Sequence, residues 1–280
     1  MISLLYCGNE GVFDGVLTSL LSILKRSTPD TYRVYIFTMS LTRIKDTYTP
    51  ISDKLIAFLN KVVKTYNEEN EVIKVDVTDH YERDFHECPN EGAYCSPYTL
   101  IRLFADLVDV IPDKVLYLDT DIMFNRDIHL LWDIDVTDYE YAAARDHYGK
   151  YLCFNPDFVN AGVLLFNMKK CRETGLFAKA RVWIQKKKLT FADQSAIARS
   201  TTKKKMLPQR FNDQKFLHKS TVVRHFSKRL FYLPYPHTDN IKQYHVDKVH
   251  KVFKYHQFDD IYEEYFKFKA EYESSGGEKQ

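Results

Sequence analysis

The sequence predicts an α/β fold in which a mostly parallel central sheet is flanked by helices and followed by a small C-terminal extension. Apolar runs of strand length alternate with amphipathic stretches at helical spacing over the first hundred residues. This alternation is typical of a doubly wound parallel sheet. A chain of 280 residues is long enough to bury one large core.

The first part of the chain alternates between strands and helices. In order, we expect a strand at 2–6, a helix at 13–24, a strand at 32–38, a helix at 52–66 and a strand at 71–77. Gly8 and Gly11 lie in the turn after the first strand, where glycine lets a ligand approach the backbone closely. The turn lacks the G-x-G-x-x-G fingerprint, so the sequence does not indicate a dinucleotide site.

The second part of the chain contains the strand on which the interpretation depends. In order, we expect a polar loop or short helix at 80–90, a helix at 98–108, a strand at 114–118, a short helix at 127–132, strands at 141–146 and 159–167, a helix at 171–187 and a helix that opens near 191. The strand at 114–118 carries no charge after its first residue, as expected of a strand that is buried on both faces.

The periodic pattern loosens beyond residue 206. We expect a strand at 221–226, an apolar strand-like run at 230–237 and an amphipathic helix at 259–272. The sequence therefore predicts a main domain at 1–212 and a C-terminal part at 213–280, whose strands and helix complete the site.

Composition and charge exclude several classes of protein. Forty basic residues against thirty-eight acidic ones give a formal charge of +2, which argues against a nucleic-acid-binding protein. The five cysteines are odd in number and form no C-x-x-C pair, so neither a disulfide framework nor a cysteine zinc site is indicated. The chain shows neither a signal peptide nor an apolar run of about 18 residues. The sequence predicts a soluble, cytoplasmic protein with at most peripheral membrane contact.

Asp119 and Asp121 directly follow the strand at 114–118. Ligands of open α/β sheets bind beyond the carboxyl ends of the strands, and residues i and i+2 of an extended chain point to the same side. Two such carboxylates repel each other unless a positive charge lies between them, and a divalent cation with a phosphate ligand would satisfy both. The alternative is a solvated turn, because Asp-Thr-Asp is also good turn chemistry.

Three further polar positions have an ordinary structural explanation. A lone Arg such as Arg102 usually faces solvent or an ion-pair partner. Asn160 is explained as a residue that favours a turn. Asp193 is explained as the N-cap of the helix that opens near 191, which leaves Gln194 without an explanation.

Several stretches together resemble glycosyltransferase family 8, which includes bacterial lipopolysaccharide glucosyl- and galactosyltransferases and glycogenin. These stretches follow the order and spacing of the family. They are K-V-L-Y-L-D-T-D at 114–121, L-W-D at 131–133, N-A-G-V at 160–163, A-D-Q at 192–194, L-P at 207–208 and R-F-N at 210–212. The resemblance is close over 1–212 and loose beyond.

The resemblance implies a type A glycosyltransferase fold and a retaining transferase. Such an enzyme moves a hexose of glucose or galactose type from a UDP-sugar to a hydroxyl of a saccharide or glycolipid acceptor, and lipopolysaccharide biosynthesis is the expected setting. It uses Mn²⁺, with Mg²⁺ as the alternative. Oxygen ligands with one imidazole suit Mn²⁺ better than Ca²⁺.

The resemblance also implies roles for individual residues. Asp119 and Asp121 correspond to metal ligands. Tyr6, Gly8 and Asn9 match the uridine-binding turn, although relatives often carry Asp where Asn9 stands. The other donor-binding residues that it implies are Arg102, Thr120, Asp146, Asn160 and Lys242. The resemblance implies that these residues bind one nucleotide-sugar donor.

Asp193 and Gln194 match the catalytic pair beneath the donor sugar, where Gln194 faces the anomeric carbon. A glutamine amide is a poor nucleophile, so a front-face route is easier to defend than covalent double displacement. In that route the departing phosphate accepts the proton of the acceptor. The Gln194 carbonyl then stabilises the oxocarbenium-like state.

The sequence offers two histidines for the third metal ligand. The family pattern His-x-x-Gly-x-x-Lys-Pro-Trp is matched imperfectly by His225, which no Gly follows at the right position. It is also matched by His237, which precedes Ile-Lys-Gln-Tyr at 241–244 with the spacing shortened by one. We expect His237 with Lys242, whose point charge would act on the phosphates, and keep His225 as the alternative.

Two rival interpretations remain. The imperfect His/Lys pattern favours, as an alternative, a nucleotide-sugar-binding protein of the same fold with weakened catalysis. A haloacid-dehalogenase-like phosphatase also has D-x-D at a strand end, but it carries Thr or Val where Met123 stands here. With twenty Tyr residues in the chain, self-glycosylation stays open.

Overall fold

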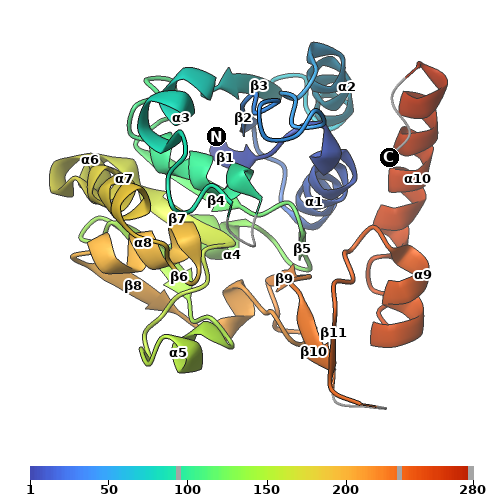
Figure 1. Cartoon of the computed structure of the whole chain (residues 1–280). Helices are drawn as coiled ribbons and strands as arrows, with labels where there is room; N and C mark the ends of the chain where they lie inside the picture. The colour runs from blue at the N-terminus through green and yellow to red at the C-terminus, as the bar shows by residue number, and fades with distance from the viewer. Residues whose placement is uncertain (93–95, 232–234, 277–280) are drawn as a thin grey trace.

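The computed structural model describes residues 1–92, 96–231 and 235–276, and a seven-stranded mixed sheet forms its centre (Figure 1). The strands are β1 (Ile2–Cys7), β2 (Tyr32–Thr38), β3 (Glu71–Asp76), β4 (Lys114–Leu118), β6 (Tyr141–Ala144), β7 (Val163–Asn167) and β8 (Lys204–Leu207). They lie in the order β3-β2-β1-β4-β7-β6-β8. β7 runs antiparallel to β4 and β6, and the other neighbouring pairs are parallel. The predicted mostly parallel sheet is confirmed.

Helices cover both faces of the sheet. They are α1 (Phe13–Arg26), α2 (Asp53–Lys64), α3 (Thr78–Phe85), α4 (His129–Trp132), α5 (Gly149–Leu152), α6 (Met168–Thr174), α7 (Leu176–Lys186), α8 (Ala192–Ser200), α9 (Val246–Lys248) and α10 (Asp259–Ser274). The 3-10 helices are η1 (Glu10–Val12), η2 (Pro97–Phe104) and η3 (Gln209–Phe211), and η4 (Val249–Phe253) is a π-helix. Side chains of α1, α2 and α10 pack in one apolar cluster, and those of α3, α7 and α8 pack in another. No helix in the described ranges is long and apolar enough to span a membrane.

Alternation along β1 decides which of its side chains reach which face of the sheet. Leu4 and Tyr6 belong to the apolar cluster of α1 and α2, whereas Leu5 and Cys7 belong to the cluster of α3 and α7. This follows because successive side chains of a strand point to opposite faces. The Tyr6 ring is fully buried, and its hydroxyl shares a hydrogen bond of 2.9 Å with Ser19 Oγ.

The C-terminal part contributes the strand β9 (Val223–His225), the antiparallel pair β10 (Arg229–Phe231) and β11 (His237–Asp239), and the long helix α10. β9 pairs antiparallel with β5 (Ile122–Phe124) of the main domain. The helix α10 runs beside the body of the molecule (Figure 1) and packs against α1. There Lys269 Nζ and the Tyr265 hydroxyl each donate a hydrogen bond of 2.8 Å to the Asp14 carboxylate. The C-terminal part therefore shares the main core, and the division at residue 212 stays a prediction.

The structure departs from the expected helices in two places. The helix expected at 171–187 is the pair α6 and α7, because Gly175 between them adopts a left-handed φ of 66°. The helix expected at 98–108 is the 3-10 helix η2. Part of the strand-like run expected at 230–237, namely 232–234, lies outside the described residues.

Gly175→Ala should lower the free energy of unfolding by about 1–2 kcal/mol, because a side chain at a left-handed φ is strained. Apart from the chain neighbours, nothing lies within 4 Å of the position that a Cβ on Gly175 would take, so the cost comes from the backbone alone. Gly92→Ala is the matched control, since Gly92 has equally open surroundings without a left-handed φ. Equal losses of stability on chemical denaturation of the two variants would contradict this explanation.

Candidate active site

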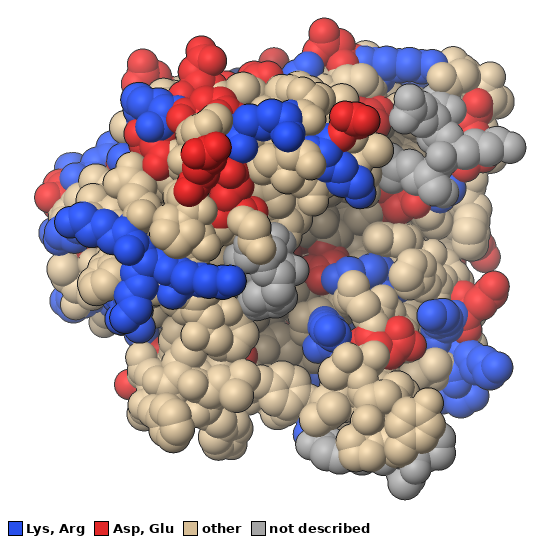
Figure 2. Space-filling view, viewed as in Figure 1, with Lys and Arg blue, Asp and Glu red and all other residues tan. Residues whose placement is uncertain are grey.

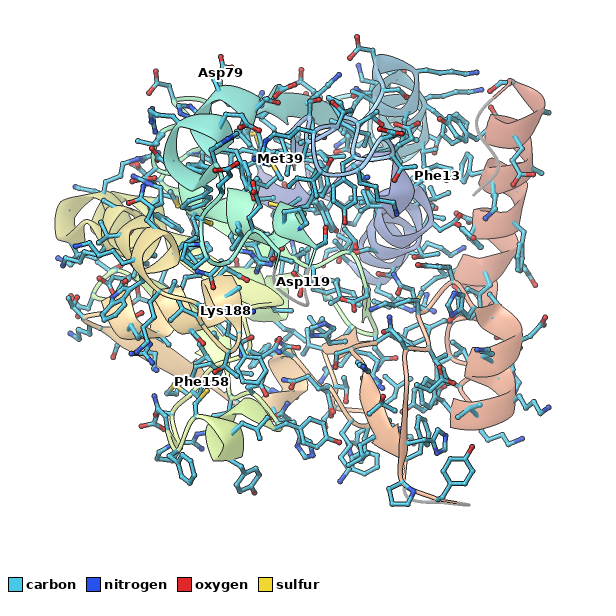
Figure 3. All side chains as sticks on the ribbon, viewed as in Figure 1. Phe13, Met39, Asp79, Asp119, Phe158 and Lys188 are labelled. Atoms are coloured by element: carbon cyan, nitrogen blue, oxygen red, sulfur yellow. The ribbon has the colours of Figure 1, made fainter. Side chains whose placement is uncertain are left out.

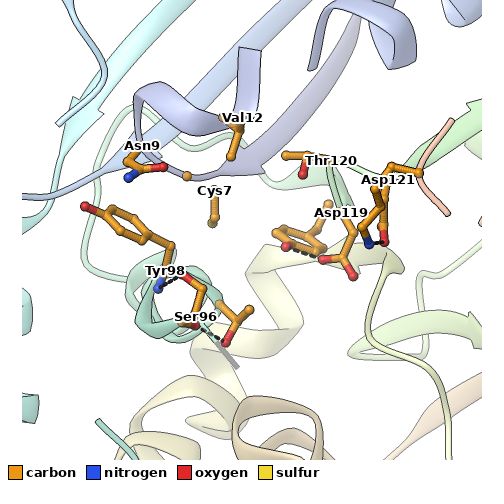
Figure 4. Close-up of a pocket in the computed structure, with 12 residues that line it drawn as sticks. Cys7, Asn9, Val12, Ser96, Tyr98, Asp119, Thr120 and Asp121 are labelled. Carbon is orange, nitrogen blue, oxygen red and sulfur yellow. Dashed lines mark hydrogen bonds and ion pairs between the residues drawn. The ribbon is translucent and has the colours of Figure 1, made fainter. Parts of the chain in front are cut away.

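A cavity of about 280 Å³ opens beyond the carboxyl ends of β1 and β4. Figure 2 shows a hollow on this face with acidic and basic atoms together inside it, and Figure 3 labels Asp119 at the same place. The lining residues are Cys7, Gly8, Asn9, Val12, Ser96, Tyr98, Thr99, Tyr117, Asp119, Thr120, Asp121 and Lys242. In Figure 4, Asn9 and Tyr98 stand at one end of the cavity and Asp121 stands at the other.

Asp119, Asp121 and His225 converge at the second end of the cavity. One ligand-type atom of each lies within 4.8 Å of those of the other two. His225 Nε2 is 2.9 Å from Asp121 Oδ1 and 3.8 Å from Asp119 Oδ2. The pairing of β5 with β9 causes this approach, because His225 stands opposite Ile122, the residue after Asp121. Two carboxylates and one imidazole form a donor set that suits a divalent cation such as Mn²⁺.

His237 lies apart from Asp119 and Asp121, so the structure brings the alternative, His225, and not His237 to the two carboxylates. It opens β11, where its ring stacks on Phe231 with 5.5 Å between centroids and its Nδ1 lies 2.8 Å from the Tyr235 carbonyl oxygen. Neither of the two candidate metal groups among the described residues includes it. Its spacing to Lys242 was misleading, because a short local pattern does not reveal that β5 and β9 pair.

Asn212 fixes the orientation of the His225 ring. Asn212 Oδ1 lies 3.0 Å from His225 Nδ1. An amide oxygen only accepts hydrogen bonds, so this contact places a proton on Nδ1. Nε2 faces the two carboxylates, which is the arrangement found when a second residue orients a metal-binding histidine.

Gly162 leaves room for this group of side chains. A Cβ at this position would lie 2.4 Å from His225 Cε1 and 2.7 Å from Asp119 Oδ2, which is closer than real Cβ atoms come to their neighbours. The glycine of the N-A-G-V stretch is therefore required by the close approach of His225 and Asp119 to the backbone.

Lys242 and Gln243 reach the site from the C-terminal part. Lys242 Nζ lies 2.5 Å from Asp121 Oδ2. Burial alone would raise the pKa of Asp121, but Lys242 and His225 hold that pKa well below its ordinary value. Gln243 is not among the residues expected from the sequence, yet its buried Nε2 donates a hydrogen bond of 2.8 Å to the Thr120 carbonyl. It therefore fixes the backbone between the two aspartates, and its place directly after Lys242 is the signal that could have identified it.

Arg102 is buried, so the solvent-facing alternative is wrong. Its guanidinium donates to the Ala161 carbonyl at 2.6 Å and to Asp119 Oδ1 at 3.1 Å, and it forms an ion pair of 3.2 Å with Asp193. It also lies 3.8 Å above the centre of the Tyr117 ring, whose hydroxyl donates to Asp119 Oδ1 at 2.7 Å. Arg102 is not one of the lining residues. It therefore supports Asp119 from behind the cavity wall.

Asp193 is the second residue of α8, whose N-cap is Phe191, so the N-cap explanation is wrong. Its side chain is buried against Arg102 instead. Burial raises the pKa of Asp193 to about 6, against the opposing effect of the Arg102 charge. The ion pair connects the start of α8 to the residues that support Asp119.

Asp146, Asn160 and Gln194 form one hydrogen-bonded group. Asn160 Nδ2 donates to Asp146 Oδ2 at 2.8 Å, and Gln194 Nε2 donates to the same oxygen at 3.2 Å. Asn212 Nδ2 donates to Asn160 Oδ1 at 2.9 Å. A continuous chain of hydrogen bonds thus connects Gln194, through Asp146, Asn160 and Asn212, to His225.

The turn after β1 lines the cavity with Cys7, Gly8 and Asn9 but not with Tyr6. The Tyr6 ring points into the core on the other face of the sheet, so only its backbone lies next to the turn, and its part in binding a nucleotide stays a prediction. Tyr98 is a lining residue that the sequence does not reveal. It lies in a 3-10 helix without a recognisable motif.

The family model described as Glycosyl transferase family 8 matches residues 3–229 of this chain. A putative glycosyltransferase of Haemophilus influenzae is 29% identical over 177 residues, which are 60% of this chain and 49% of the relative. Glycosyltransferase GlyB of Streptococcus pneumoniae is 30% identical over 129 residues, which are 46% of this chain and 30% of the relative. The chain thus spans about half or less of the length of these curated relatives.

Solved structures show the same fold. A variant of LgtC described as an active-site mutant, with Glu in place of Gln, has a TM-score of 0.64 at 19% identity, covering 80% of this chain and 86% of that chain. The galactosyltransferase LgtC in complex with donor and acceptor sugar analogues has a TM-score of 0.61 at 20% identity with the same coverage. Glycosyltransferase GlyE of Streptococcus pneumoniae has a TM-score of 0.64 at 17% identity, covering 95% of this chain and 64% of that chain. These likenesses confirm the expected type A glycosyltransferase fold.

The raised pKa of Asp193 predicts a stability difference that depends on pH. An Asp in the unfolded chain titrates near about 3.9. The folded protein therefore keeps a proton that the unfolded chain loses, and the contribution of Asp193 to stability falls as the pH rises through its folded pKa of about 6. We expect the free energy of unfolding of the wild type, minus that of Asp193→Asn, to fall by on the order of 2 kcal/mol between pH 4 and pH 7.

Urea denaturation of both proteins across this pH range measures the difference, which should level off above about pH 7. A difference that rises with pH would show instead that the Arg102 ion pair dominates and that the pKa of Asp193 is lowered.

Proposed function

The chain belongs to glycosyltransferase family 8, and we propose that it is a retaining transferase that moves a hexose from a UDP-sugar to a hydroxyl group of a saccharide or glycolipid. The observation that carries this proposal is the convergence of Asp119, Asp121, His225 and Lys242 at one end of the cavity. Support also comes from LgtC, which has the same fold and has been solved with donor and acceptor sugar analogues.

The two ends of the cavity offer different chemistry, as a nucleotide diphosphate sugar requires. At one end, the turn at Gly8 and Asn9 offers backbone groups, and Tyr98 offers an aromatic ring to a base and ribose. At the other end, the Lys242 ammonium offers a point charge to phosphates. The choice of uridine rests on the resemblance of the turn after β1.

Asp119, Asp121 and His225 would hold the divalent cation, with Mn²⁺ preferred and Mg²⁺ as the alternative. These three residues fit a divalent cation because two carboxylates and one imidazole are suitable ligands. Gly162 has no Cβ, which leaves room for His225 and Asp119 beside its backbone. When bound, the cation supplies Lewis-acid stabilisation of the charge on the leaving diphosphate. Lys242, which balances the Asp121 charge, adds a second positive group on the same side.

Asp146, Asn160 and Gln194 would face the donor sugar, the first two by binding its hydroxyl groups. The Gln194 amide is held at both ends, since Nε2 donates to Asp146 and Oε1 accepts from a backbone N–H at 3.0 Å. Asp193, the adjacent carboxyl group, is engaged by Arg102 and is not free to attack. This arrangement favours a front-face route in which the departing phosphate accepts the acceptor's proton and Gln194 stabilises positive charge on the sugar.

The alternative is a nucleotide-sugar-binding protein of the same fold with weakened catalysis. The observation that favours it is the departure from the family pattern, in which Pro stands where this chain has Gln243. Against it, His225 and Lys242 both contact Asp121 despite the altered spacing. We therefore favour the enzyme.

The acceptor, the pathway and the location are proposed from the resemblance alone. We propose a saccharide or glycolipid as the acceptor and lipopolysaccharide biosynthesis as the pathway. The proposed location is the cytoplasm, with at most peripheral membrane contact. We also propose that residues 213–280 complete a nucleotide-sugar site built mainly by residues 1–212.

Thermal unfolding with UDP-glucose and UDP-galactose, each with and without Mn²⁺, followed by measurement of UDP release, tests the function. We expect the melting temperature to rise only when the nucleotide sugar and Mn²⁺ are both present, and slow hydrolysis should accompany the rise. Asp121→Asn should fold but release UDP on the order of a hundredfold more slowly, because a metal ligand and its charge are lost.

Two other results would change the assignment. A rise in melting temperature without any UDP release would favour the binding protein. The absence of a rise with every UDP compound would contradict the proposed donor.

His225→Ala and His237→Ala separate the two candidate metal ligands. His225→Ala should raise the Mn²⁺ concentration needed for half-maximal UDP release by at least about tenfold, because one ligand is removed. His237→Ala should leave that concentration unchanged, and far-UV circular dichroism checks that both variants fold. The reverse result would return the ligand to His237.

A further inference from the structure

A second group of ligand-type side chains lies in the C-terminal part, outside the site described above. His250 is in the π-helix η4, His256 follows in the connection to α10, and Asp259 is the first residue of α10. Each offers a ligand-type atom within 4.8 Å of those of the other two. The π-helix is a rare conformation that often marks functional positions.

The Asp259 carboxylate contacts both imidazoles. Its Oδ1 lies 2.7 Å from His250 Nε2, and its Oδ2 lies 3.2 Å from His256 Nδ1. The two rings stack with 4.5 Å between their centroids. Three ligand-type side chains from three separate positions of the chain thus lie close together.

A bound cation requires the His256 ring to rotate out of its stack on His250, because the two ring planes differ by only 23° and their nitrogens do not point at one position. In a four-coordinate zinc site the bonds are about 2.0–2.1 Å long, so ligand atoms lie about 3.3 Å apart. Each imidazole now lies 2.7 or 3.2 Å from its own Asp259 oxygen, and the cation would replace these hydrogen bonds. His256 is 63% exposed, which leaves solvent access for water as a fourth ligand.

We propose that His250, His256 and Asp259 bind a late first-row divalent cation, for which Zn²⁺ is the representative ion. Two imidazoles with one carboxylate favour Zn²⁺, Ni²⁺ or Cu²⁺ over Mg²⁺ and Ca²⁺, which prefer oxygen ligands. The group at Asp119 has the opposite composition, two carboxylates with one imidazole. The two sites therefore select different metals.

A cation bound here fastens the start of α10 to η4. The helix α10 is held against α1 by ion pairs, among them Arg26 with Asp260 at 2.6 Å and Lys269 with Asp14 at 2.8 Å. The segment that carries Lys242 comes shortly before η4 in the chain. The proposed site is thus a structural clamp on the part of the chain that delivers Lys242, and no step of sugar transfer passes through it.

The test uses full-length protein in which Asp119→Asn and Asp121→Asn disable the other candidate metal group. After removal of metal with a chelator, this protein should bind one equivalent of Zn²⁺ and should unfold at a higher temperature with Zn²⁺ than without it, because a ligand that binds only the folded state stabilises that state. Adding His256→Ala should abolish both effects.

His86→Ala is the matched control. His86 is 50% exposed and contacts a carboxylate, that of Glu82, at 2.6 Å. It is in neither of the two metal-type groups of the described residues. Its substitution should leave the Zn²⁺ equivalent and the temperature shift unchanged.

Co²⁺ provides a second measurement, since its visible d–d absorption strengthens when it is held in a four-coordinate site, and this absorption should vanish with His256→Ala. The proposal is overturned if the His256→Ala protein binds Zn²⁺ as well as its parent does. It is also overturned if the parent binds no Zn²⁺, in which case the three residues form a hydrogen-bonded cluster only.

Discussion

Two carboxylates at the end of a buried strand need positive charge beside them, and the rest of the site is arranged around that need. Arg102 balances Asp119 from behind the cavity wall, and Lys242 balances Asp121 from the C-terminal part. His225 stands beside both carboxylates on a third segment. These three groups come from η2, from the segment before α9 and from β9, so one local charge requirement ties together distant parts of the chain.

The regular elements could be predicted because burial leaves a continuous apolar run in the sequence. The strands expected at 32–38 and 114–118 coincide with β2 and β4. The direction of β7 could not be predicted, since an apolar run is the same for parallel and antiparallel pairing. The break at Gly175 was also hidden, because one glycine inside a helical pattern is often tolerated.

The same distinction between local and long-range signals applies to the candidate site. Asp119 and Asp121 could be predicted because their signal is local, a charged pair at the end of an apolar strand. The position of His225 beside both carboxylates depends on the pairing of β5 with β9, a contact between segments far apart in sequence, which a local pattern could not show. The burial of the Tyr6 ring could also be predicted, because alternation along β1 places it on the opposite face from Cys7.

Lys242 lies 121 residues after Asp121 in the chain. Closing so long a loop costs conformational entropy, which the packing of the C-terminal part must offset. The helix α10 packs in the same apolar cluster as α1, so the contacts that stabilise the C-terminal part are also the ones that hold Lys242 beside Asp121. A substitution that loosens α10 from α1 therefore disturbs the charge balance of a carboxylate that is distant from α10 in the sequence.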